Sequence, residues 1–72
     1  MAKKIIGISC DRWKAKTFRN GLNKDGFNLV YDNGLKQIHV FKIECEEKDF
    51  EATKTKLQKT LTLLEIKCKQ SN

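Results

Sequence analysis

The stretch Phe27–Ile43, FNLVYDNGLKQIHVFKI, constrains the fold most, because it has the pattern of a β-hairpin. Asn33-Gly34 near its middle suits the two positive φ angles of a type I′ turn. A two-residue turn at this point pairs Leu29 with Ile38. Side chains alternate between the two faces of a sheet, so this register predicts one apolar core face. The residues expected on that face are Phe27, Leu29, Tyr31, Ile38 and Val40.

The opposite face of the predicted hairpin is mixed, and we expect it to be partly solvated. Its members are Asn28, Val30, Gln37, His39 and Phe41. The strand after the turn, Ile38 to Ile43, is the most apolar one, which is typical of a central strand. We expect truncation of Leu29, Ile38 or Leu61 to alanine to cost about 2–4 kcal/mol, as for core residues.

A strand and a helix precede the hairpin. Lys3 to Ser9 alternates like a strand, with Ile6, Ile8 and Cys10 on one face. Asp11 suits the N-cap of a helix from about Arg12 to about Lys24. The apolar stripe of that helix consists of Ala15, Phe18 and Leu22.

The end of this first helix has two alternatives, because glycine lowers helix stability by about 1 kcal/mol. Either the helix ends at Asn20 and Gly21 is its stop, or it continues to Lys24 and stops at Asp25-Gly26.

A second helix is predicted from about Asp49 into the sixties. Residues 64–69, LEIKCK, also alternate like a strand, but neither Gly nor Pro separates them from the helix. A continuing helix is therefore favoured, and a short final strand is the alternative. The apolar stripe consists of Phe50, Leu57, Leu61, Leu64 and Cys68.

These elements predict an α+β fold of order β-α-β-β-α within a single domain of residues 1–72. A right-handed crossover makes the first two strands parallel, and the hairpin places the third strand antiparallel to the second. With the third strand in the middle, the order is 1-3-2, a ferredoxin-like split β-α-β with two helices on one sheet face. The first strand then lies at an edge, which predicts a homodimer formed through that strand.

The net charge of +6 is unevenly distributed along the 72 residues. Residues 1–43 hold nine Lys or Arg and three acids, a net +6. Residues 44–51 sum to −4 and residues 52–72 to +4. A basic surface of this kind favours polyanionic partners, nucleic acid first.

Trp13 is the aromatic residue that stands out in the first helix. It points about 160° away from Ala15 on a helical wheel, so it falls outside the apolar stripe. An aromatic side chain among cations can stack on a base or anchor a protein partner. The alternative is a later helix start, with Trp13 packed under the first turn. The predicted binding residues are Arg12, Trp13, Lys16, Arg19, Asn20 and Lys24.

No catalytic, cofactor or metal site is predicted. His39 is the single histidine, and local spacing places no nucleophile or carboxylate beside it. Cys10, Cys45, Cys68 and His39 could supply four zinc ligands, but the topology puts Cys45 at the far end of the sheet from Cys10. The acidic run ECEEKDFE lacks the spacing of a calcium loop and suits the start of a helix.

Two functions remain open from the sequence. The first is a small, basic, non-enzymatic nucleic-acid-binding module. The second is a protein-interaction module, such as a phage or mobile-element protein that inhibits a host nucleic-acid-processing machine. No apolar run reaches the roughly 20 residues of a membrane span and no signal peptide is visible, so a cytoplasmic location is expected.

One short resemblance adds to these alternatives. Gly26-Phe27, followed by strand, turn, strand and His39, resembles small RNA-cleaving toxins of a double-stranded-RNA-binding-like fold. The first strand departs from the pattern of that family, and no site residue is carried over from it.

Overall fold

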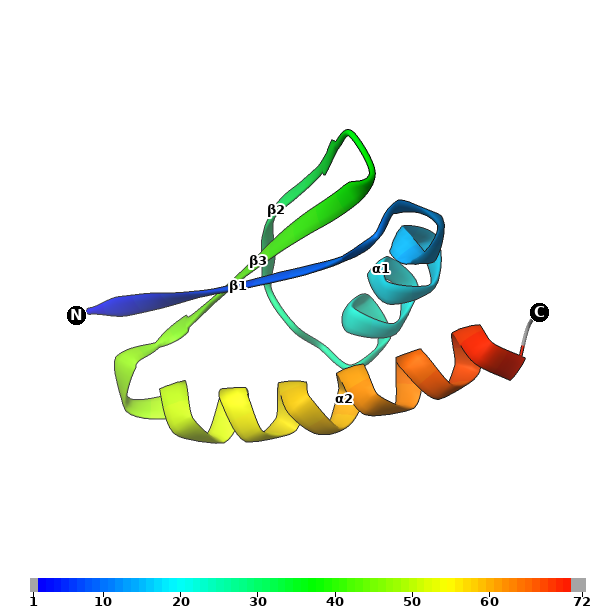
Figure 1. Cartoon of the computed structure of the whole chain (residues 1–72). Coiled ribbons are helices and arrows are strands. Elements are labelled where there is room, and N and C mark those ends of the chain that lie inside the picture. The colour runs from blue at the N-terminus through cyan, green and yellow to red at the C-terminus, as the bar shows by residue number, and fades with distance from the viewer. Residues whose placement is uncertain (1, 71–72) are drawn as a thin grey trace.

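The fold is a three-stranded antiparallel sheet with both helices on one face, in the order strand-helix-strand-strand-helix (Figure 1). The computed structural model describes residues 2–70. The elements are β1 (Lys3–Asp11), a 3-10 turn η1 (Arg12–Lys14), α1 (Ala15–Lys24), β2 (Leu29–Leu35), β3 (Ile38–Glu46), a second 3-10 turn η2 (Glu47–Asp49) and α2 (Phe50–Gln70).

The strand order is β1-β3-β2, which confirms the predicted topology. β3 pairs antiparallel with both neighbours, so β1 and β2 run in the same direction. Nine consecutive residues of β1 pair with β3, from Lys3 opposite Glu46 to Asp11 opposite Ile38. Among residues 2–70, β1 has no partner on its other side, and it forms one edge of the sheet.

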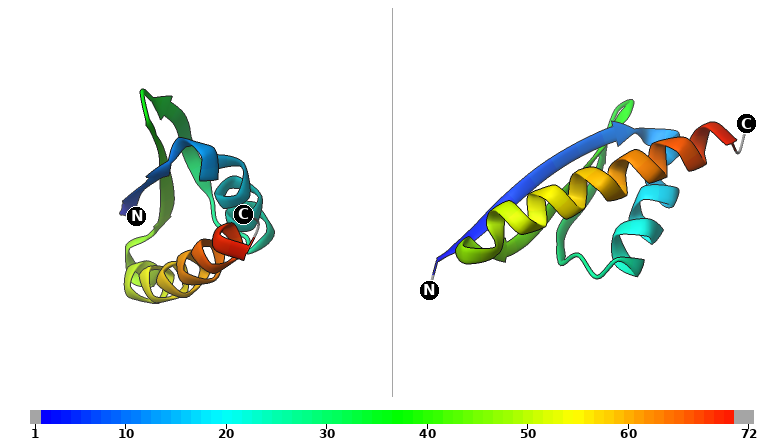
Figure 2. Two further views of the ribbon diagram at one scale, coloured as in Figure 1. Left: turned by 45° about the vertical axis from the view of Figure 1, so that its right-hand side comes forward. Right: turned by 90° about the horizontal axis from the view of Figure 1, so that it is seen from below.

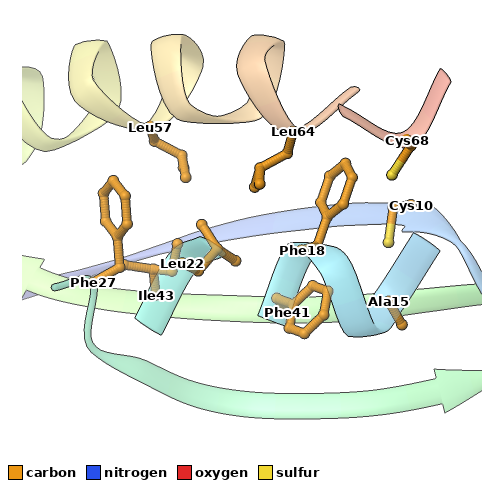
Figure 3. Close-up of a cluster of buried hydrophobic side chains, with 10 residues drawn as sticks. All are labelled: Cys10, Ala15, Phe18, Leu22, Phe27, Phe41, Ile43, Leu57, Leu64 and Cys68. Atoms are coloured by element: carbon orange, nitrogen blue, oxygen red, sulfur yellow. The ribbon is translucent and has the colours of Figure 1, made fainter. Parts of the chain in front are cut away.

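The core lies between the sheet and the two helices (Figure 3). β3 contributes Phe41 and Ile43, which are almost completely buried. The stripe predicted on α1 faces these residues, and Phe18 and Leu22 are buried as expected. Phe50, predicted to begin the stripe of α2, is half-buried and lies outside this cluster. From α2, the buried residues are Leu57, Thr60, Leu64 and Cys68, and Leu61 packs against the cluster.

The hairpin turn lies at Lys36-Gln37 and not at Asn33-Gly34, so the predicted register is wrong. Leu35 pairs with Ile38 across the turn, and Lys36 takes a left-handed φ of 49°. A bulge between Leu29 and Tyr31 changes the alternation, so Leu29 faces the helices and Tyr31 faces solvent.

The register exchanges the two faces of the predicted hairpin. His39 and Phe41 are buried, whereas Ile38 is 43% exposed. The reason is visible further along the strand. The face that carries Ile38 and Val40 continues with Lys42 and Glu44, whose charges are costly to bury. The assignment of Ile38 to the core is therefore wrong.

Both helix ends left open by the sequence are settled. α1 continues through Gly21 to Lys24 and stops at Asp25-Gly26, where Gly26 has a φ of 84°. α2 continues to Gln70, so residues 64–69 are helical. Among the described residues, neither helix combines the length and apolar composition needed to cross a membrane.

Candidate nucleic-acid interface

Trp13 lies at the junction between β1 and α1, in the 3-10 turn η1. The α-helix begins at Ala15, later than predicted, yet Trp13 does not pack under its first turn. It is 60% exposed, one of the most exposed large apolar residues of the described chain. Lys14 Nζ lies 5.3 Å from the centroid of the Trp13 ring, and a cation at this distance restrains the indole.

Lys14 is itself held by the end of α2. Its Nζ donates a hydrogen bond to Glu65 Oε2 at 2.7 Å, and this contact raises the pKa of the Lys14 amine. Asp11 Oδ2 lies 3.8 Å from the same nitrogen. The tryptophan therefore sits beside an ammonium group that two carboxylates already neutralise.

The outer side of α1 carries three of the predicted binding residues. Lys16, Asn20 and Lys24 are exposed and follow one another at intervals of four, so they form one stripe about 12 Å long. No side-chain hydrogen bond or ion pair within residues 2–70 involves these three side chains. We call Trp13, Lys16, Asn20 and Lys24 the α1 outer surface.

Arg12, also predicted to bind a partner, is exposed and contacts the hairpin turn. Its backbone N–H donates to Gln37 O at 3.0 Å, and its side-chain Nη1 donates to Lys36 O at 3.1 Å. These bonds satisfy two carbonyl oxygens of the turn, so Arg12 fixes the hairpin to the start of the first helix.

Arg19 pairs with Asp32 of β2. Arg19 Nη2 donates to Asp32 Oδ1 at 2.9 Å, and Arg19 Nε donates to the other carboxylate oxygen, which makes the pair bidentate. The Arg19 guanidinium, opposed by partial desolvation and helped by His39, lowers the pKa of Asp32 from 3.8 to about 2. The pair joins α1 to the hairpin, and Arg19 is not available as a free cation.

His39 completes this cluster, which the sequence did not reveal. Its Nε2 contacts Asp32 Oδ1, and its ring centroid lies 4.7 Å from that of Phe41. The expectation that no carboxylate lies beside His39 is wrong, because the shifted register brings Asp32 diagonally across from it on the helix-facing side. The signal in the sequence was the pair of charges at Lys42 and Glu44, which disfavour burial of their face of β3 and so favour the register that brings Asp32 near His39.

The contacts of this cluster join α1, β2 and β3 through Arg19, Asp32 and His39. Cys10 lies opposite His39 in the β1–β3 register, but burial, with the nearby Asp11 carboxylate, raises the pKa of its thiol to about 11. A nucleophilic cysteine needs the reverse shift. His39 is 8% exposed and Asp32 is already neutralised by Arg19.

The cysteines are distributed as the topology predicted. Cys45 pairs with Lys4, whereas Cys10 pairs with His39 six residues further along β1, about 20 Å away. Cys68 returns to the Cys10 end of the core (Figure 3). Within residues 2–70, no three side chains of His, Cys, Asp or Glu gather in a way that could hold a metal ion.

Comparisons with protein-family models, with curated proteins and with solved structures found no match.

Proposed function

We propose that the protein binds single-stranded nucleic acid without sequence preference, through the α1 outer surface. One observation carries the proposal: Trp13 is 60% exposed at the head of a stripe of unpaired basic and amide side chains. A large exposed apolar side chain is unfavourable in water and commonly marks a contact. Base stacking on such an aromatic is worth about 1–3 kcal/mol and tolerates any base.

The two lysines of the stripe supply the electrostatic part of the interaction. Lys16 and Lys24 have no intramolecular partner among the described residues, so phosphate groups can contact both without first breaking an ion pair. Asn20 between them can donate to a phosphate or a base edge. A single strand suits the surface better than a duplex, because only unpaired bases offer a free face to Trp13.

The test is a titration of labelled single-stranded and duplex oligonucleotides at several salt concentrations from about 50 to 200 mM. Affinity should fall steeply with salt and be higher for the single strand. Trp13→Ala should weaken binding by about 1–3 kcal/mol. Lys16→Ala with Lys24→Ala should lower the slope of log K against log salt by about 1.4, the value for two phosphate contacts on a single strand.

A matched control separates a specific surface from net charge. Lys48→Ala with Lys54→Ala removes the same charge from η2 and from the first turns of α2, at the end of the molecule away from α1 (Figure 1). This control should keep most of the affinity. Equal losses in both double variants would mean that only total charge matters. An absence of binding at low salt would instead support the protein-interaction alternative, with the same surface facing an acidic protein.

A further inference from the structure

We propose that two copies of the chain join through their β1 strands, antiparallel and centred on Gly7, to form a continuous six-stranded sheet. This assembly goes beyond the proposed nucleic-acid interface and does not depend on it. The strand that carries it, Lys3–Asp11, is paired on one side only within the described residues.

The free edge of β1 is protected only by charges near its two ends. Proteins block such edges with proline, bulges, short strands, charged side chains or covering elements, and β1 carries Lys3, Lys4 and Asp11 but no charge from Ile5 to Cys10. β1 is nine residues long, contains no proline and pairs with β3 without a register shift. In the right-hand view of Figure 2, β1 runs along one margin of the molecule, and no helix lies beyond its outer edge.

The core is also incomplete along this edge. Ile6 and Ile8 of β1 face the helices but are only half-buried. Both residues belong to the strand that lacks a partner, so a second copy paired with β1 can cover them.

The sequence of β1 is self-complementary when two copies run antiparallel. When two identical strands pair about a two-fold axis, the residue numbers of every opposed pair add up to the same sum. This sum must be even, because successive pairs along an antiparallel ladder alternate between two hydrogen-bonding patterns, whereas an odd sum would make two successive pairs equivalent by symmetry. A sum of 14 engages all nine residues and places Gly7 opposite Gly7 of the second copy. It also places Ile6 of each copy opposite Ile8 of the other, which gives two apolar cross-strand pairs in the dimer.

Charge selects the direction of this pairing. The same register opposes Lys3 of each copy with Asp11 of the other, and both side chains lie on the face away from the helices. A parallel arrangement would instead oppose Lys3 with Lys3 and Asp11 with Asp11. Both side chains are accessible, at 54% and 60% exposed, and each has only a long contact within its own chain: Lys3 Nζ lies 3.4 Å from Glu44 Oε1, and Asp11 Oδ2 lies 3.8 Å from Lys14 Nζ.

The first experiment is a charge exchange followed by sedimentation over a wide range of protein concentration. Lys3→Asp alone, or Asp11→Lys alone, places like charges opposite each other twice per dimer and should weaken the dimer about tenfold. The double variant restores opposite charges and should recover the wild-type dissociation constant. A wild-type chain that stays monomeric at every concentration overturns the proposal. So does a dimer that neither single variant weakens.

The second experiment reads the register directly, with the Gly7→Cys variant in a Cys45→Ser background. A Cβ added at Gly7 meets nothing within 4 Å, so the fold should tolerate the change. Directly opposed strand residues lie about 4.5–5.5 Å apart between Cα atoms, within disulfide range. Mild oxidation should therefore cross-link Gly7→Cys and leave Ile5→Cys, about 13 Å from its own copy, uncross-linked. Equal cross-linking of the two variants would refute the register.

Discussion

Gly21 of α1 lies against the side chain of Leu64 of α2, so closely that a Cβ on Gly21 would fall 2.4 Å from Leu64 Cδ2. Gly21, which lowers the intrinsic stability of α1, is therefore the point where α1 and α2 approach each other. Leu64 is buried, so its side chain cannot move aside without disturbing the core.

Gly21→Ala should destabilise the protein by about 1–3 kcal/mol through overpacking, although the same change in an exposed helix would stabilise it by about 1 kcal/mol. Chemical denaturation measures the effect. In a Leu64→Ala background the clash is gone, and Gly21→Ala should then be neutral or stabilising. A destabilisation of the same size in both backgrounds would show that Leu64 is not the obstacle.

Truncation of β3 should distinguish its two faces. Phe41→Ala should cost about 3–5 kcal/mol, because Phe41 is completely buried. Ile38→Ala, at a 43% exposed position, should change the free energy of unfolding by only about 0.5 kcal/mol. If Phe41→Ala fails to fold, Phe41→Leu gives a milder comparison. A larger loss of stability for Ile38→Ala than for Phe41→Ala would instead support the register with the turn at Asn33-Gly34.

The Asp32 pair should make stability sensitive to acid. Because the pKa of Asp32 falls from 3.8 unfolded to about 2 folded, its stabilisation is complete above about pH 4 and disappears as the pH falls through about 2. Asp32→Asn should lower the free energy of unfolding at neutral pH by about 1.5–3 kcal/mol, the range for hydrogen bonds to charged groups. It should also flatten the pH dependence in this window. Glu47→Gln, at an exposed carboxylate, should leave that window unchanged.

Trp13 should fluoresce as a solvent-exposed indole in the free protein. Its emission should lie toward the red and be quenched readily by a neutral quencher, because the residue is 60% exposed. Trp13→Ala should change the free energy of unfolding by about 0.5 kcal/mol at most. Blue-shifted, protected emission in the free chain would place the ring against other side chains and remove the basis of the proposed interface.

The topology could be predicted from the sequence because it depends on patterns that span whole elements. Ala15, Phe18 and Leu22 define one side of α1 whatever the exact helix start, and all three are buried. The edge position of β1 follows from the connection between the first two strands. Such features survive an error of a few residues in any boundary.

The hairpin register could not be predicted from the turn residues alone. Asn33-Gly34 is a strong local signal, but the register is decided by what β3 must bury. Lys42 and Glu44 exclude one face of that strand, and considering them would have assigned Phe41 to the core. Because the predicted register was wrong, it did not reveal the contact between Asp32 and His39 or the ion pair between Arg19 and Asp32.

The long separation in sequence between β1 and its partner has a consequence for how the chain folds. The β2–β3 hairpin joins residues that are close in sequence, whereas β1 meets β3 across as many as 43 positions, from Lys3 to Glu46. Closing the larger loop costs more entropy before any contact compensates for it, so we expect β1 to dock late. Changes in the hairpin should then slow folding, whereas changes in β1 should mainly accelerate unfolding. The edge strand would thus set how long the native state lasts once it has formed.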